Sequence, residues 1–299
     1  MASQEAENRE VVSRYMDVTN RGDLAVLDEL VIEEYVEHDP MPGQGAGREG
    51  LKGAHVAIRS AFPDGHFDVE QLLAQGDLVF ARGLVRGTHG GTFMGVAPTG
   101  KAVQFSTSRL FRLAGGRLTE GWTNADMMGL LQQLGAIPSP GGAPPPEGPV
   151  APTADAASTA STAESEAVMR RMIGELWNDG DLAVADELFH PQSTSPSAPR
   201  LPPGPEGVKM IVSMFRSAFP DYWISIEELV ADDGLVAARL RQGGTQSGEL
   251  MGIPPSGKRA EWTEMGLLRV AGGQVLESWY DVDMLSLMSQ LGVGSSPAG

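Results

Sequence analysis

The chain has 299 residues, of which 41% are hydrophobic and 20% charged, as expected for a globular protein long enough for two domains with separate cores. Its formal net charge of −17 disfavours nucleic acid and anionic membranes as partners, because such a field repels polyanions. The absence of cysteine excludes disulfides and thiolate chemistry. The acidic amino terminus is not a signal peptide, and no apolar run is long enough for a membrane span, so we expect a cytoplasmic protein.

Three helices are predicted at the start of the chain. Residues 5–19 carry an apolar stripe with helical spacing, which predicts the first helix. Asp23 is suited to N-cap a second helix that continues through Val31. A Gly-rich loop precedes the third helix, residues 48–61, which Pro63 ends.

After the third helix the apolar period changes to two, which predicts an antiparallel meander of four strands joined by Gly-containing turns. The four expected strands are residues 66–74, 78–88, 101–113 and 117–125. A short closing helix follows, with an apolar stripe that ends at Gly135. This order predicts the α+β class, with helices packed on one face of a curved sheet and a cone whose mouth could take a small ligand.

The second half of the chain repeats the first. The segment NRGDLAVLDEL at 20–30 matches NDGDLAVADEL at 178–188 in nine of eleven positions, and RSAFPD at 59–64 recurs unchanged at 216–221. The spacing between the copies changes by one residue between these two matches, so one residue was gained or lost there. The pattern predicts two tandem domains of one fold.

Between the copies lies a tract of Pro, Gly, Ala, Ser and Thr, residues 138–162, with almost no bulky apolar side chain. Such a composition cannot form a core and is typical of an extended linker. We therefore expect one domain over residues 3–137 and the other over 163–294. The linker should be cleaved by proteases while both domains stay intact.

Each copy ends in a strand that leads into a helix and places an aspartate near a tryptophan, as Trp122 and Asp126 in the first copy and Trp279 and Asp283 in the second. Period two puts Trp122 and Asp126 on the same face of their strand. Asp126 could abstract a proton next to a carbonyl if a pocket raised its pKa by desolvation. An Asp directly before an apolar helix is also a favoured N-cap, and that alternative is open.

Taken together, the motifs of both halves resemble the SnoaL-like polyketide cyclase (ester cyclase) family. In the first half these motifs are Asn20-x-Gly-Asp23, YVEHDP at 35–40, GREG at 47–50, AFPD at 61–64, GTH at 87–89, MGxxPTGK at 94–101, Trp122-x-x-x-Asp126 and LQQLG at 131–135. The resemblance implies two tandem cone-shaped NTF2-like α+β barrels. It also implies cofactor-independent ring closure of a polyketide-type intermediate by intramolecular aldol condensation, in natural product biosynthesis. The family's acid/base aspartate resembles Asp126, and its pocket histidine resembles His38.

The first copy is the better candidate for catalysis. His38 could donate a hydrogen bond to an enolate oxygen or orient Asp126, and Asp39 lies beside it as a possible substrate contact. The second copy has QSTSP at 192–196 in this place, without His or Asp. The alternative for His38 and Asp39 is an ordinary surface loop.

The second copy has polar and aromatic candidates of its own. Trp262, Glu264, Trp279 and Asp283 could line a pocket, and Glu264 replaces Thr107 of the first copy on the same strand face. Glu264 and Asp283 could form an acid/base pair of carboxylates. The alternative is a pocket that has lost its function, or ordinary sheet surface.

A metal or a cofactor is not expected. The five histidines show no ligand spacing, and the MGxxPTGK segment lies between two strands, which favours a hairpin turn over a phosphate loop. Arg82 and its counterpart Arg239 could hold an oxyanion, although a strand arginine is more often a solvated or interface residue.

Three functions are therefore open. The first is cyclisation of a polyketide-like small molecule by acid/base chemistry. The second is epoxide opening, which the same fold supports and which predicts two carboxylates facing each other across a pocket. The third is a non-catalytic small-molecule-binding module in which the two halves form an intrachain pseudo-dimer, or two chains form a homodimer.

Overall fold

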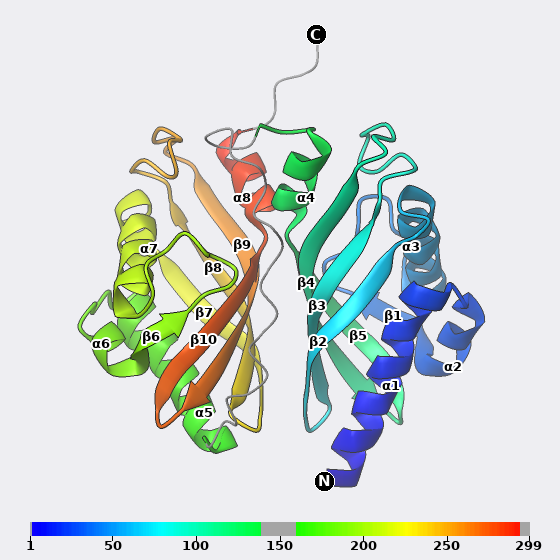
Figure 1. Ribbon diagram of the computed structural model, residues 1–299, viewed down its shortest axis with the longest axis horizontal. Coiled ribbons are helices and arrows are strands. Elements are labelled where there is room, and N and C mark those ends of the chain that lie inside the picture. Colours follow the sequence, from blue (N-terminus) through cyan, green and yellow to red (C-terminus); the bar gives the residue numbers. More distant parts are fainter. Residues whose placement is uncertain (1, 139–159, 294–299) are drawn as a thin grey trace. The chain divides into compact units, whose positions relative to one another are not determined.

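The computed structural model describes residues 2–138 and 160–293 (Figure 1). The chain divides into two compact units, residues 1–149 and 150–299, and each unit contains one copy of the repeat. Nearly all of the predicted linker lies outside the described residues. None of the described helices is both long and apolar enough to cross a membrane.

The first unit contains the predicted helices and strands, with bounds that differ by a few residues. Its elements are α1 (Ala2–Arg21), η1 (Leu24–Val26), α2 (Leu27–Leu30), β1 (Val31–Glu37), α3 (Gly47–Ala61), β2 (His66–Gln75), β3 (Leu78–Thr88), β4 (Ala102–Ala114), β5 (Arg117–Ala125) and α4 (Met127–Leu134). Asp23 does cap a helical turn, since its carboxylate accepts from the Ala25 N–H at 3.2 Å. The expectation that this helix includes Val31 is wrong, because Val31 begins strand β1.

The sheet of the first unit has the order β1-β5-β4-β3-β2. The four predicted strands form an antiparallel meander. Strand β1, which the sequence pattern did not predict, pairs in parallel with β5 at the edge of the sheet. This pairing brings the residues after α2 next to the amino-terminal half of β5, more than 80 positions later in the chain.

Helices α1 and α3 lie on one face of this sheet, which we call the inner face (Figure 1). The core between them contains Tyr15 of α1, Leu51 of α3 and Phe111 of β4, each at most 4% exposed. Side chains alternate along each strand, so the neighbours of inner-face residues point to the opposite, outer face. Apolar burial on the inner face is the main force that holds the unit together.

The second unit has the same architecture. Its elements are α5 (Thr162–Arg171), η3 (Met172–Asn178), α6 (Val184–Leu188), β6 (Phe189–Thr194), α7 (Pro205–Ala218), β7 (Trp223–Asp232), β8 (Leu235–Thr245), β9 (Arg259–Ala271), β10 (Gln274–Val282) and α8 (Met284–Leu291). The strand order is β6-β10-β9-β8-β7, which matches that of the first unit. Trp122 pairs with Leu110, and Trp279 pairs with Leu267 at the same place in the sheet. The predicted correspondence of the two halves is therefore confirmed in strand order and register.

A further one-residue difference between the copies lies in the first helix. In the second unit this helix passes into a π-helical segment, η3, which accommodates one extra residue per turn. At the end of this segment, Asn178 donates to the Ile224 carbonyl at 2.9 Å, as Asn20 donates to the Phe67 carbonyl at 3.0 Å. At its start, buried Met172 takes the place that Tyr15 has in α1.

Candidate functional site

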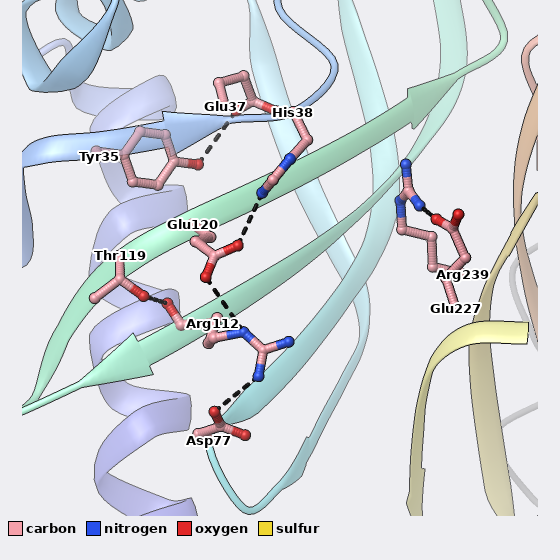
Figure 2. Close-up of polar contacts among 9 residues, drawn as sticks. All are labelled: Tyr35, Glu37, His38, Asp77, Arg112, Thr119, Glu120, Glu227 and Arg239. Carbon is pink, nitrogen blue, oxygen red and sulfur yellow. Dashed lines mark hydrogen bonds and ion pairs between the residues drawn. The ribbon is translucent and has the colours of Figure 1, made fainter.

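Five polar side chains meet on the inner face of the first unit, and we call them the interior cluster. They are Tyr15 of α1, Tyr35 and Glu37 of β1, His55 of α3 and Arg109 of β4. The Tyr15 hydroxyl oxygen accepts from Arg109 Nη1 at 3.1 Å and lies 3.2 Å from His55 Nε2. The Tyr35 hydroxyl donates to Glu37 Oε2 at 3.2 Å (Figure 2).

The interior cluster has one fixed cation and one carboxylate, and its other members are neutral. Burial raises the pKa of Tyr15 and Tyr35, so both stay phenols at neutral pH. Burial, with the charge of Arg109, lowers the pKa of His55 to about 3, so the imidazole is uncharged. Burial also raises the pKa of Glu37, against the opposing effects of the Arg109 charge, the Tyr35 hydroxyl and a backbone N–H.

Two further details concern the surroundings of this cluster. The Oε1 atom of Glu37 is buried and makes no hydrogen bond with the described residues. Gly121 of β5 lies against the cluster, and a Cβ at this position would overlap the Tyr35 hydroxyl oxygen. In the second unit Ser278 replaces Gly121, and Ser193 replaces Tyr35. The small residue at 121 and the tyrosine at 35 are therefore a matched pair.

We expect Gly121→Ser to destabilise the protein by about 1–3 kcal/mol, because the added side chain overlaps the Tyr35 hydroxyl. The double variant Gly121→Ser/Tyr35→Ser reproduces the pair of the second unit and should relieve this overlap. Urea unfolding of the wild type, both single variants and the double variant completes a double-mutant cycle. The double variant should be more stable, by about 1 kcal/mol or more, than the sum of the two single effects predicts. Additive effects would show that the two positions do not share this space.

A cavity of about 260 Å³ lies beside the cluster, between the end of α1, α3 and β3. Apolar and small residues line it, among them Val18, Ile58, Phe62 and Val85. His55 also lines it, so this side chain connects the cavity with the interior cluster. Thr19, Arg59 and Ser60 add further polar groups to a lining that is mostly apolar. Such a hollow, with His55 as the polar wall toward the interior cluster, is suited to a small organic ligand.

The predicted residues His38, Asp39 and Trp122 come together at the end of β1. The His38 ring stacks on Trp122, with ring centres 4.5 Å apart and 3° between the planes. His38 Nε2 lies 2.8 Å from Glu120 Oε2, and about a third of each side chain is exposed. Asp39 accepts from the Thr123 N–H at 3.2 Å.

These contacts belong to an outer-face network that Figure 2 shows as a chain of polar contacts, from His38 through Glu120 and Arg112 to Asp77. Trp122 follows Gly121 in β5, and Gly121 faces the Tyr35 hydroxyl. Alternation along the strand therefore places Trp122 on the face opposite the interior cluster.

Arg82 and Thr107 lie on different faces of the sheet. Arg82, 1% exposed, forms an ion pair with Glu70, and its counterpart Arg239 pairs with Glu227 in the same way (Figure 2). Thr107 is on the inner face, and its hydroxyl donates to the Asn124 carbonyl at 3.1 Å. The structure thus gives Arg82 a carboxylate partner within its own sheet.

Asp126 is the N-cap of α4 and accepts from the Gly129 N–H at 2.8 Å. Asp283 caps α8 in the same way, with the Ser286 N–H at 3.0 Å. The capping geometry that the sequence left open is therefore present in both units. Desolvation raises the pKa of Asp126 and the bond from Gly129 lowers it, and its catalytic role stays a prediction.

The second unit does not repeat the interior cluster. The equivalent positions hold Met172, Ser193, Ser195, Val212 and Gly266.

Glu264, in the place of Thr107, has a polar environment of its own. Its carboxylate accepts from Gln242 Nε2 at 2.8 Å, and the Gln242 Oε1 atom accepts from the Tyr222 hydroxyl. Burial raises the pKa of Glu264 to about 7, the Asp281 charge acts in the same direction, and the bond from Gln242 opposes both.

The remaining candidates of the second unit are Trp262, Trp279 and Asp283. Trp262, 2% exposed, packs among aromatic rings, and Trp279 is 1% exposed. The acid/base pair that Glu264 and Asp283 could form stays a prediction, and Asp283 hydrogen-bonds to the start of α8. Among the residues that the structure describes, no group of three or more His, Cys, Asp or Glu side chains could hold a metal ion.

The chain contains two copies of one α+β domain. The first copy has the interior cluster beside a small cavity, and the second copy lacks the cluster. The family model of the SnoaL-like polyketide cyclases matches the sequence over residues 9–134 and again over residues 167–291. The chain therefore belongs to this family, as a tandem of two copies.

Three similar proteins each match a stretch that is less than half of this chain. Aklanonic acid methyl ester cyclase DnrD of Streptomyces peucetius is 28% identical over 130 residues, which are 42% of this chain and 88% of that enzyme. TsrD from Streptomyces laurentii is 27% identical, with a TM-score of 0.42 over 44% of this chain and 98% of that protein. IdmH, a putative polyketide cyclase from Streptomyces antibioticus, is 34% identical, with a TM-score of 0.40 over 43% of this chain and 98% of that protein.

Proposed function

We propose that the first unit binds a small polyketide-type carbonyl compound at the interior cluster and closes a ring in it by acid/base chemistry, without a cofactor. One observation carries this proposal: a carboxylate whose pKa burial raises, Glu37, shares one interior with the fixed cation Arg109 and the phenol Tyr15. A carboxylate with a raised pKa is a stronger general base near neutral pH. A guanidinium and a phenol can stabilise the enolate oxygen that forms.

The reaction proceeds in three steps. Glu37 takes the proton from a carbon next to a carbonyl group. The electron pair of the C–H bond forms a carbon–carbon double bond, and the π electron pair of the carbonyl group moves onto its oxygen to give an enolate. Arg109 and Tyr15 hold this oxygen while the enolate carbon attacks a second carbonyl carbon of the same molecule, which forms the ring bond. The new alkoxide then takes the proton back from Glu37, so the steps balance without an oxidant or a reductant.

Neutral His55 positions this machinery. Its Nε2 contacts the Tyr15 hydroxyl, and its pKa of about 3 keeps it from competing with Arg109 as a second cation. His55 also faces the cavity, where it can contact the ligand. The relative DnrD is named as a cyclase of an ester, which supports a carbonyl compound as the substrate class.

The rival functions predict other arrangements. Epoxide opening needs two carboxylates that face each other across the pocket. Glu37 is the single carboxylate among the five residues of the interior cluster. Asp126 is the competing candidate for the base, and its carboxylate accepts a hydrogen bond from the Gly129 N–H at the start of α4. A binding module needs the cavity but not the reactivity of Glu37.

The test uses an anthraquinone that carries a 3-oxo ester side chain, incubated with the full chain in D₂O. We expect deuterium uptake between the two carbonyl groups to be faster than in buffer, together with a product that retains the carbon skeleton and contains an additional ring. NMR spectroscopy and mass spectrometry measure both. Calorimetric binding without exchange would support the binding module and contradict the cyclase.

A further inference from the structure

We infer that the side chains at four positions of the repeat decide whether a unit contains a ligand cavity, and that the chain binds one small molecule, in the first unit. The second unit closes the equivalent space with its own aromatic side chains. The nature of the ligand rests on the proposed function, whereas the open and closed states of the two units rest on the side chains described next.

In the first unit the four positions are occupied by Thr19, Ile58, Gly65 and Val85, and all four line the cavity. None of these side chains is aromatic, and Gly65 has no side chain. They come from the end of α1, from α3, from the turn before β2 and from β3. Small side chains at these four points leave the space between the helices and the sheet open.

The second unit has Trp177, Phe215, Tyr222 and Gln242 at the same positions. Backbone hydrogen bonds and strand register fix the correspondence. The Gly65 N–H donates to the Phe62 carbonyl and the Tyr222 N–H to the Phe219 carbonyl, both at 2.9 Å. Val85 pairs with Phe105 across the sheet, as Gln242 pairs with Trp262.

The enlarged side chains pack against one another. Trp177 lies 6.2 Å from Phe215 and 5.7 Å from Tyr222, measured between ring centres. Phe215 lies 6.0 Å from Tyr222 and 6.1 Å from Trp262. Rings at these separations are in contact, so they occupy the space that is hollow in the first unit.

Hydrogen bonds hold this group in place. The Tyr222 hydroxyl donates to Gln242, and Gln242 donates to Glu264, so the ring at position 222 is tied to strands β8 and β9. Val212 replaces His55, which removes the polar wall that connects the cavity with the interior cluster in the first unit. The second unit therefore lacks both the space for the ligand and the polar contact to it.

Xenon under pressure is the first probe, because it enters apolar cavities whatever their natural ligand. In crystals of the full chain we expect xenon between Ile58, Phe62 and Val85, and none among the aromatic rings of the second unit. Xenon in both units would overturn the inference, and so would its absence from the first unit.

Two variants exchange the side chains between the units. Gly65→Tyr/Val85→Gln should exclude xenon from the first unit, whereas Val69→Gln, at an exposed position of β2, should leave it bound. Trp177→Thr/Tyr222→Gly should admit xenon to the second unit. Because this opening variant removes two large aromatic rings, Phe215→Ile is a milder second variant that should also create a xenon site. A closing variant that still binds xenon would contradict the inference.

Calorimetry with 1,8-dihydroxyanthraquinone is the second probe. We expect one molecule bound per wild-type chain and at least a 10-fold loss of affinity in Gly65→Tyr/Val85→Gln. Two molecules per chain would overturn the inference. The xenon pattern without anthraquinone binding would support the closure of the second unit and contradict only the proposed class of ligand.

Discussion

Glu37→Gln should lower the rate of deuterium uptake and of ring closure by about 10²–10⁴-fold, the usual contribution of a general base. The variant retains the size of the side chain and an oxygen that can accept from the Tyr35 hydroxyl. It removes the proton acceptor and leaves Arg109 without this carboxylate in the interior. Initial rates for wild type and variant give the effect, and the melting temperature shows whether the fold is retained.

Asp126→Asn is the matched control for this experiment. Asn caps helices about as well as Asp, so the bond from the Gly129 N–H and the stability of α4 should change little. If Glu37 is the base, Asp126→Asn should retain activity within a few fold of wild type. A collapse in Asp126→Asn with full activity in Glu37→Gln would assign the base to Asp126 and contradict our proposal.

The sequence predicted the fold class because its signals are local. The apolar periods of the helices and of the four meander strands are visible within short windows, and the repeat gives each of them twice. Strand β1 was not predicted because its apolar and polar residues do not alternate with a period of two, and its register shifts between Val31 and Val36. Its partner is β5, distant in sequence, and no local pattern specifies a parallel pairing of this kind.

The interior cluster was not predicted from the sequence, for a related reason. Its members come from four elements, and each of them alone resembles an ordinary residue: Tyr15 fits an apolar helix stripe, and His55 a helix surface. The available signal was Arg109, which lies at period two with Thr107 and Phe111 and so shares the inner face of strand β4 with them. An arginine at such a position, with a glycine in the other copy, marks a polar interior in one domain only.

The stacking of His38 on Trp122 illustrates what the sequence can and cannot predict. Trp122 was predicted on the last strand and His38 in a separate loop near the pocket, and their rings stack on each other. Which face they occupy depends on strand register, and Gly121 decides it because the Tyr35 hydroxyl fills the inner side. Their predicted roles with substrate stay untested by this arrangement.

Lowering the pH from 6.5 to 4 should cost the first unit roughly 3 kcal/mol of folding free energy through His55. The folded pKa of this histidine is about 3, because burial and the Arg109 charge disfavour the imidazolium, whereas its ordinary value is 6.5. Between these values the unfolded chain binds a proton that the folded chain does not. Stability therefore falls as the pH falls through this window, and the contribution of His55 is constant above it.

His55→Val isolates this effect, and Val212 shows that the fold accepts valine at the equivalent position of the second unit. Hydrogen exchange of peptides from α3 and β4 at increasing urea concentrations reports the unfolding free energy of the first unit. Glu37 acts in the opposite direction, since its raised pKa favours the folded state on acidification, but it is present in both proteins. The difference between wild type and variant should therefore change by roughly 3 kcal/mol between pH 6.5 and 4. A difference that does not vary with pH would show that the folded unit protonates His55 as easily as the unfolded chain does.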